Sequence, residues 1–319
     1  MTRIFITGGT GFIGSHVVRT LAARETCQVV VLTRSPRTDA GNVSYRVGDV
    51  ADAPSLARAA EGADVVLHFA GCKRVAAEFH RTNVVGTHNV VSMCEQAQVR
   101  RLIYLSSVGV IGPTSEIQVT EETPCHPANG YERSKLEAEL HVRQFSARRP
   151  GTTTILRPTN VFGENDPEVH LLNLFRRLKS DQFFFVGRDI SQYALNYLYV
   201  PEISALVGAL IETTPTGDLF IVNTPTPLAE FIATSKRLLD APKPVRHLPY
   251  WLVKTAALAG DRLPRRVAPV NSLKLAELTS RKQYSADLLA RQAGWRPAFA
   301  MEDALRNMIA HYREKGLLA

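Results

Sequence analysis

The stretch ITGGTGFIGSH, residues 6–16, decides the fold class of this chain. It follows an apolar run, RIFITG at 3–8, and leads into a helical pattern, FIGSHVVRTLAAR at 12–24. The glycines Gly8, Gly11 and Gly14 permit a tight turn and let the backbone approach a bound group closely. A helix that begins at such a turn points unpaired N–H groups forward, which suits a pyrophosphate. The stretch therefore predicts a dinucleotide-binding strand–turn–helix unit.

Runs rich in Val, Ile and Leu alternate with helical patterns up to about residue 165. We expect strands at 3–8, 28–34, 43–50, 63–71, 101–110 and 152–163, and helices at 12–24, near 53–60, 83–97 and 130–146. Near-continuous apolar strands between helices indicate a parallel sheet that is buried on both faces. Right-handed crossovers then give an α/β fold with a doubly wound, Rossmann-type sheet.

After about residue 165 the alternation stops and helical patterns dominate. They occupy 167–180, 201–213, 227–239, 250–263 and 301–315, with short strand patterns at 196–200 and 218–223. We expect residues 1–165 to form the dinucleotide-binding domain, with a return strand near 218–224. Residues 166–319 are expected to form mainly a smaller, mostly helical substrate-binding lobe.

Composition argues against several functions. The net charge of +8 is spread along the chain without a run of five basic residues, so no nucleic-acid partner is expected. No apolar run of about 18 residues and no signal-peptide layout is present, so we expect no membrane partner. The isolated cysteines indicate no metal site, a cytoplasmic location and buried, inert thiols at Cys27, Cys72, Cys94 and Cys125.

The end of the second expected strand, VVVLTRSPR at 29–37, bears on the choice of cofactor. About twenty residues after the glycine loop, an acid binds the ribose 2′-hydroxyl of NAD, whereas a basic residue suits the 2′-phosphate of NADP. Thr33 and Arg34 occupy this place and no acid is there. Arg34 therefore predicts NADP. NAD stays an alternative, because Arg34 can equally be a solvated side chain.

A second stretch, NGYERSKLEAEL at 129–140, places Tyr131 four residues before Lys135. On a helix these two side chains share one face. The spacing also arises by chance on exposed helices, so it points to proton chemistry only in combination with a dinucleotide.

Several motifs together make the first 165 residues resemble the extended short-chain dehydrogenase/reductase family, of the NAD-dependent epimerase/dehydratase type. They occur in the family's order and at fitting intervals. These motifs are TGGTGFIG (7–14), GDV (48–50), HFAG (68–71), NVVGT (83–87), LSSVGVIG (105–112), YERSK (131–135) and LRPTNVFG (156–163).

The resemblance implies three catalytic residues, Ser107, Tyr131 and Lys135. Tyr131 would move a proton on or off a substrate oxygen while the nicotinamide moves a hydride. Lys135 would favour the phenolate of Tyr131 and hold the nicotinamide ribose. Ser107 would bind the same substrate oxygen, and the neighbouring Ser106 is expected to meet backbone.

The resemblance also implies the cofactor contacts Gly8, Gly11, Phe12, Ile13, Gly14, Arg34, Asp49, Val50, Phe69, Ala70, Gly71, Lys73 and Lys135. Asp49 would accept a hydrogen bond from the adenine amino group, with a helix N-cap as the alternative. Asn83 resembles an asparagine near the family's active site, although a buried structural hydrogen bond fits equally. His68 is expected to be a core histidine.

On the substrate side, Asn160 and Ser107 are the expected contacts. Nucleotide-sugar members carry an arginine for the diphosphate where this chain has Leu195, and nearby substitutes would be Arg176, Arg177 and Arg188. The segment 247–266 is similar to members that act on hydroxysteroid- or flavonol-like substrates.

Three functions follow. A nucleoside-diphosphate-sugar 4-ketoreductase or 4-epimerase is favoured. The alternatives are an NADPH-dependent reductase or dehydrogenase of a less polar alcohol, and a non-catalytic dinucleotide-binding regulatory protein. The resemblance implies a homodimer through the helices at about 83–98 and 131–147.

Overall fold

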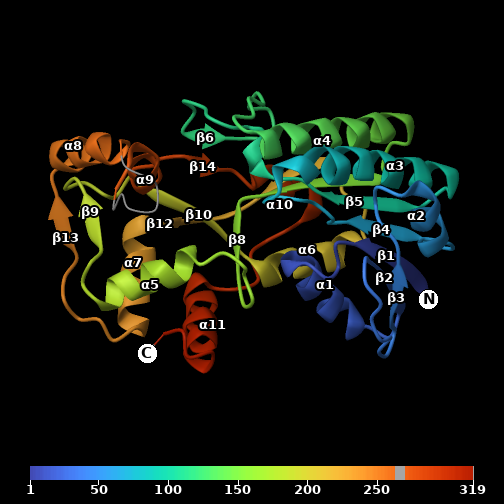
Figure 1. Cartoon of the computed structure of the whole chain (residues 1–319), viewed down its shortest axis with the longest axis horizontal. Coiled ribbons are helices and arrows are strands. Elements are labelled where there is room, and N and C mark those ends of the chain that lie inside the picture. Colours follow the sequence, from blue (N-terminus) through green and yellow to red (C-terminus); the bar gives the residue numbers. More distant parts are fainter. Residues whose placement is uncertain (263–269, 319) are drawn as a thin grey trace.

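A computed structural model describes residues 1–262 and 270–318. Its centre is a parallel sheet of seven strands in the order β11-β7-β5-β4-β1-β2-β3 (Figure 1). The strands are β1 (Thr2–Thr7), β2 (Cys27–Thr33), β3 (Val43–Val47), β4 (Val65–His68), β5 (Arg101–Leu105), β7 (Thr153–Pro158) and β11 (Leu219–Val222). The strand order reverses between β1 and β4, which confirms the predicted doubly wound, Rossmann-type fold.

Helices cover both faces of this sheet, as the apolar strands require. One face carries α2 (Ala53–Ala59), α3 (Gly86–Gln96) and α4 (Gly130–Arg148), which enclose a core with Phe5, Tyr104 and Phe145. The other carries α1 (Phe12–Ala22), α6 (Val200–Leu210) and α10 (Asp287–Ala293) over Ile4 and Ile6. In Figure 1 the helices α3 and α4 lie above the sheet, and α1 and α6 lie below it.

The C-terminal region is mixed rather than mainly helical. Its helices are α5 (His170–Lys179), α7 (Leu228–Leu238), α8 (Tyr250–Gly260), α9 (Ser272–Leu278) and α11 (Met301–Glu314). A three-stranded sheet has the order β12 (Thr224–Pro227), β10 (Ala194–Tyr199), β8 (Asn160–Phe162). Two small pairs are β13 (Arg246–Leu248) with β9 (Phe184–Val186), and β14 (Gln283–Tyr284) with β6 (Gln118–Val119). Strands this short leave little alternation to detect in the sequence.

Two expected segments reach beyond the described residues. The last position of the helix expected at 250–263 lies outside them, as does the end of the segment 247–266. Within the described ranges, every helix is too short or too polar to cross a bilayer.

The single strand expected at 152–163 is wrong, because the chain leaves the large sheet at Thr159. The Thr159 N–H donates to the Val222 carbonyl at 3.1 Å, and its hydroxyl bonds to Asn223 Oδ1 at 2.8 Å. The preceding Pro158 has no N–H with which to continue a ladder. The next strand, β8, pairs with β10, so Asn160 is carried into the C-terminal region.

The chain after residue 165 also contributes to the large sheet. Strand β11 lies parallel to β7, from Leu219 beside Ile155 to Val222 beside Pro158. Helix α6 packs on α1, where Arg24 donates to the Gly208 carbonyl at 3.1 Å. The boundary at 165 stays a prediction, since segments from both sides of it form one sheet.

Candidate active site

The glycine loop joins β1 to α1 in a turn that other residues would disrupt. Gly8 has φ +72°, and a Cβ there would lie 2.5 Å from the Ala70 nitrogen. A Cβ on Gly14 would lie 2.2 Å from the Gly8 carbonyl oxygen. In this fully described loop no side chain caps α1, whose N-cap is Gly11. The free N–H end of α1, with Phe12 and Ile13 half-buried in its first turn, fits a dinucleotide pyrophosphate.

The residues after β4 lie directly beside this loop. The Phe69 N–H donates to the Thr7 carbonyl at 3.0 Å, and the Ala70 N–H donates to the Thr7 hydroxyl at 3.3 Å. Gly71 is the next residue, and a Cβ placed on it would lie 3.4 Å from Asn83 Oδ1. The structure thus brings Phe69, Ala70 and Gly71 together with the glycine loop.

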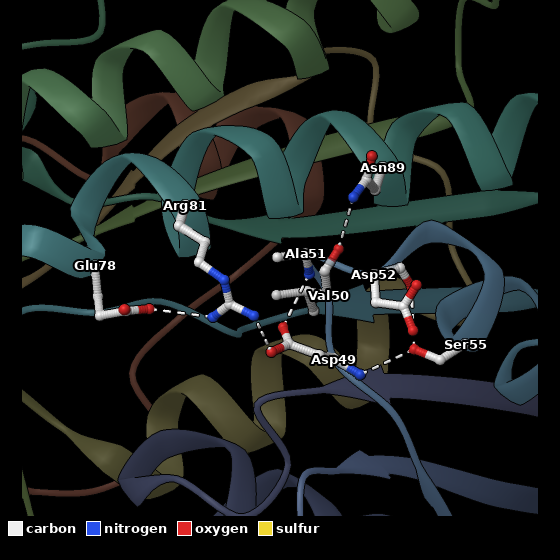
Figure 2. A network of polar contacts seen from close by, with 8 residues as sticks. All are labelled: Asp49, Val50, Ala51, Asp52, Ser55, Glu78, Arg81 and Asn89. Atoms are coloured by element: carbon white, nitrogen blue, oxygen red, sulfur yellow. Dashed lines mark hydrogen bonds and ion pairs between the residues drawn. The ribbon is translucent and has the colours of Figure 1, made fainter.

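Asp49 lies at the centre of a polar network after β3 (Figure 2). Its Oδ1 accepts from the Ala51 N–H at 2.9 Å, and its Oδ2 pairs with Arg81 Nη2 at 2.5 Å. Burial raises the pKa of Asp49, but the Ala51 N–H and the charges of Arg81 and Arg34 outweigh it and leave the pKa below its usual value. The N-cap of α2 is Asp52, so the N-cap alternative for Asp49 is wrong.

Arg81 is a residue that the sequence did not single out. It reaches Asp49 from η2 (Phe79–Val85), a π-helical turn that follows η1 (Ala76–Glu78). Its Nη1 also pairs with Glu78 at 3.1 Å. The exposed Arg34 acts on the same carboxylate, so two arginines flank Asp49. Beside it, the buried Val50 accepts a hydrogen bond from Asn89 through its carbonyl at 3.0 Å.

Lys73 pairs with an acid from a distant segment of the chain. Its ammonium lies 3.7 Å from Glu168, which also pairs with Arg74 at 3.2 Å. Arg74 donates in addition to the Pro167 carbonyl at 3.2 Å. The loop after β4 is therefore tied to the segment before α5, and the cofactor role of Lys73 stays a prediction.

Tyr131 and Ser107 meet where α4 begins. The helix starts with a capping box in which Asn129 Oδ1 accepts from the Glu132 N–H at 2.9 Å and the Glu132 carboxylate accepts from the Asn129 N–H. This cap places Tyr131 in the first turn, where its hydroxyl interacts with Ser107. The Tyr131 ring also packs edge-on against Phe79, with 6.0 Å between ring centroids.

Lys135 lies one turn further along α4 and is buried. Its ammonium donates to the Leu105 carbonyl at 2.7 Å and lies 4.4 Å from the centre of the Tyr104 ring. Burial lowers the pKa of Lys135 to about 7, against the opposing charge of Glu139.

The expected lowering of the Tyr131 pKa by Lys135 is not found. Burial raises the pKa of Tyr131 to about 12, Glu132 and Cys72 raise it as well, and the hydrogen bond to Ser107 opposes them. The lysine ammonium is directed to Leu105 instead. Tyr131 is therefore a neutral phenol, suited to donating a proton.

Buried polar residues brace this arrangement. Asn83 exchanges hydrogen bonds with the Cys72 backbone, N–H to Oδ1 at 2.7 Å and Nδ2 to carbonyl at 2.9 Å, and also donates to the Ser134 hydroxyl at 2.8 Å. Asn83 was expected either near the active site or in a structural hydrogen bond, and the structure shows the structural hydrogen bonds. His68 is a core histidine as predicted, bonded to Thr7 at 2.6 Å and Thr87 at 2.9 Å.

Two smaller expectations are wrong. The Ser106 hydroxyl donates to the Glu139 carboxylate at 2.8 Å rather than to backbone. Among the free thiols, Cys27 and Cys94 are buried, but Cys72 and Cys125 are only half-buried, because both lie on loops.

The predicted substrate contacts are not gathered at one point. Asn160 is exposed at the start of β8. Leu195 packs against the apolar cluster that contains Phe175 and Phe231. Arg176 donates to the Leu317 carbonyl at 2.8 Å, so its guanidinium is already engaged by another segment of the chain. The remaining candidates, Arg177 and Arg188, are exposed.

Residues 4–218 match the model of the NAD dependent epimerase/dehydratase family. Together with the fold and the glycine loop, this match shows that the chain belongs to that family. The chain is an NAD(P)-dependent oxidoreductase of the short-chain dehydrogenase/reductase type.

Similar proteins act on different substrates. The chain is 27% identical over 280 residues to the 4-hydroxy-2-methyl-3-oxo-4-farnesyl-3,4-dihydroquinoline-1-oxide ketoreductase of Stigmatella aurantiaca, covering 84% of this chain and 82% of that protein. It is 27% identical over 334 residues to the human sterol-4-alpha-carboxylate 3-dehydrogenase, decarboxylating, covering 98% and 88%. The UDP-glucuronic acid 4-epimerase of Bacillus cereus, solved with NAD, shares the fold with a TM-score of 0.74 at 16% identity, covering 98% and 99%.

Proposed function

We propose that Tyr131, Ser107 and Lys135 interconvert an alcohol and a ketone next to a bound dinucleotide. The observation that carries this proposal is the placement of a half-buried Tyr131 beside Ser107 in the first turn of α4, one turn before the buried Lys135. The nicotinamide, when bound, supplies a hydride to the carbonyl carbon or accepts one from the carbinol carbon.

The protein's own groups handle the substrate oxygen. In the direction of reduction, the Ser107 hydroxyl donates a hydrogen bond to the carbonyl oxygen and stabilises its developing negative charge. The Tyr131 hydroxyl gives its proton to that oxygen, so that hydride and proton together yield the alcohol. Lys135 offers its ammonium to the nicotinamide ribose, since only one of its three N–H groups is used by the Leu105 carbonyl.

The substrate class we propose is a less polar ketone or alcohol, rather than the nucleotide sugar that the sequence favoured. Leu195 stands where nucleotide-sugar members carry their diphosphate arginine, and it packs into an apolar cluster. Arg176, a possible substitute, is bonded to Leu317. The names of the ketoreductase and the sterol dehydrogenase support the same choice. A nucleotide sugar remains the second candidate, because Asn160 is exposed at the start of β8 and is free to meet a polar substrate beside the C-terminal region.

For the cofactor we propose a preference for NADP. Arg34, exposed directly after β2, offers a positive charge to a 2′-phosphate, whereas Arg81 is already paired with Asp49 and Glu78. We further propose a homodimer through α3 and α4, whose outer faces include the exposed Leu140. Light scattering of the purified chain tests the dimer, and a monomeric mass at micromolar concentration would contradict it.

One experiment tests the reaction and the substrate class together. Turnover of NADPH is followed with a panel of hydrophobic ketones, including a 3-ketosteroid, and with dTDP- and UDP-linked keto sugars. We expect activity with the hydrophobic ketones, and we expect Tyr131→Phe to lower kcat about 100-fold or more while NADPH binds as before. Activity confined to the keto sugars would overturn the substrate class. Near-normal turnover by Tyr131→Phe would overturn the role of Tyr131.

A further inference from the structure

Helix α4 contacts the end of β5 through three successive turns. Tyr131 interacts with Ser107, Lys135 donates to the Leu105 carbonyl at 2.7 Å, and Glu139 accepts from the Ser106 hydroxyl at 2.8 Å. The three helix residues are four positions apart and therefore lie on one face. The first two belong to the proposed chemistry, whereas Glu139 has no role in it so far.

Glu139 is held in place by an ion pair in the core. Both Glu139 and Arg157 have side chains with no exposed surface. Arg157, from β7, donates twice to the carboxylate, with Nη2 at 2.6 Å from Oε1 and Nε at 3.0 Å from Oε2. Arg143, one turn further along α4, pairs with the same carboxylate at 2.8 Å. A two-bond arginine–carboxylate contact fixes the orientation of the carboxylate as well as its position.

A buried ion pair is weak evidence for stability, because desolvation of the two charges offsets much of their attraction. Apolar side chains would fill the same space at little cost. The position of this pair, one turn beyond Lys135 and in contact with the neighbour of Ser107, suggests a different reason for it.

Resting on the proposed function, we propose that Glu139, oriented by Arg157, is a positioning residue that keeps Lys135 charged and fixes Ser107 through Ser106. Glu139 touches neither substrate nor cofactor. It acts through its negative charge on Lys135, and through its hydrogen bond on the loop that carries Ser107.

The groups around Lys135 explain why this charge matters. Tyr131 and Glu139 lie on the same face of α4 as Lys135, the Tyr104 ring of β5 lies under its ammonium, and His68 of β4 feels its charge. Of these four, the two tyrosines and the histidine are neutral near pH 7, since burial raises the pKa of Tyr131 and Tyr104 and lowers that of His68. Glu139 is therefore the negative charge among them, and without it burial alone acts on the ammonium.

The action of Glu139 on Lys135 and its action on Ser107 can be separated with two variants. Glu139→Gln combined with Arg157→Leu removes both buried charges, while the glutamine oxygen still accepts from Ser106. Ser106→Ala removes the hydrogen bond and leaves both charges. The matched control is Glu95→Gln with Arg148→Gln, which removes an exposed ion pair at 2.9 Å between α3 and α4.

The first measurement is the titration of Lys135 by NMR of its side-chain carbon next to the ammonium, followed at a series of pH values. It needs no substrate, so it decides the proposal even if no alcohol or ketone proves to be turned over. We expect a midpoint near pH 7 in the wild type and in the control. In the charge-free double variant we expect a midpoint lower by about one pH unit or more. An unchanged midpoint in that folded variant would overturn the proposed action on Lys135.

The second measurement is the pH profile of kcat/KM. The charge-free double variant should move the acidic limb of the profile in step with the Lys135 titration, which a merely structural pair would not do. Ser106→Ala should lower kcat about 10-fold with the Lys135 midpoint unchanged. Wild-type kcat in Ser106→Ala would overturn the role on Ser107. If the double variant fails to fold, Glu139→Asp serves instead, since it withdraws the charge by one methylene and should shift the same midpoint downward.

Discussion

Lowering the pH should destabilise this protein through one buried side chain, His68. The imidazole is fully buried on β4 and bonds to two threonine hydroxyls. The Thr87 hydroxyl donates to the Asn83 carbonyl at 2.5 Å, so it accepts from Nε2 of His68, and Thr7 then donates to Nδ1. Only the neutral ring with its proton on Nε2 satisfies both bonds. A second proton would remove the acceptor that Thr7 needs.

The size of the effect follows from the two protonation states. Burial, and then the charge of Lys135, lowers the pKa of His68 from 6.5 to about 3 in the folded chain. The unfolded chain therefore binds this proton below pH 6.5, and the folded chain binds it only near pH 3. Stability is full above pH 6.5 and falls as the pH drops between these values. Between pH 7 and pH 5 the loss from this one group is about 2 kcal/mol.

Urea unfolding at pH 7, 6 and 5 measures the loss. His68→Gln can donate to Thr87 and accept from Thr7 without titrating, so the free energy of unfolding should fall less with pH than in the wild type. The difference between the two slopes isolates His68 from the carboxylates, which titrate in both proteins. His126→Gln, at an exposed position, is the control and should keep the wild-type slope. Equal slopes in His68→Gln and the wild type would refute the argument.

Three other substitutions probe the cofactor site and its support. Gly14→Ala should abolish NADPH binding in calorimetry, because the new Cβ would lie 2.2 Å from the Gly8 carbonyl oxygen; wild-type affinity would contradict the loop geometry. Arg34→Ser should raise KM for NADPH about 10-fold and leave KM for NADH unchanged, so an equal change in both would remove Arg34 from cofactor selection. Asn83→Ala should cost about 1–3 kcal/mol in urea unfolding, because three hydrogen bonds, one buried and two part-buried, lose their partner; a cost near zero would contradict its bracing role.

The parts of the site that the sequence predicted are those built from neighbouring residues. The glycine loop spans a single turn between β1 and α1, and its meaning lies in glycine itself. The helix with Tyr131 and Lys135 starts at Asn129, whose capping partner Glu132 is three residues on and visible in the sequence. Both signals are local, so they need no knowledge of the packed structure.

The parts that the sequence did not predict depend on contacts between distant segments. Arg81 reaches Asp49 from 32 residues away, by way of a π-helical turn that no periodicity indicates. Glu139, Arg157 and Ser106 belong to three separate elements, and only the packed sheet brings them together. The pKa of Tyr131 is raised by burial rather than lowered by Lys135, whose ammonium donates to Leu105, and neither contact can be foreseen from spacing along one helix.

The edge strand β11 has a consequence for how the chain is made. The large sheet is completed by residues 219–222, which lie beside β7, and α6 at residues 200–210 covers one of its faces. On the ribosome, the first 165 residues therefore emerge with an unpaired β7 edge and an apolar face that α1 covers only in part. Residues 200–210 must follow before α6 extends the cover of that face, and residues 219–222 before β11 pairs with the edge. A fragment ending at 165 should accordingly aggregate, and a useful truncation would have to keep the chain through Val222.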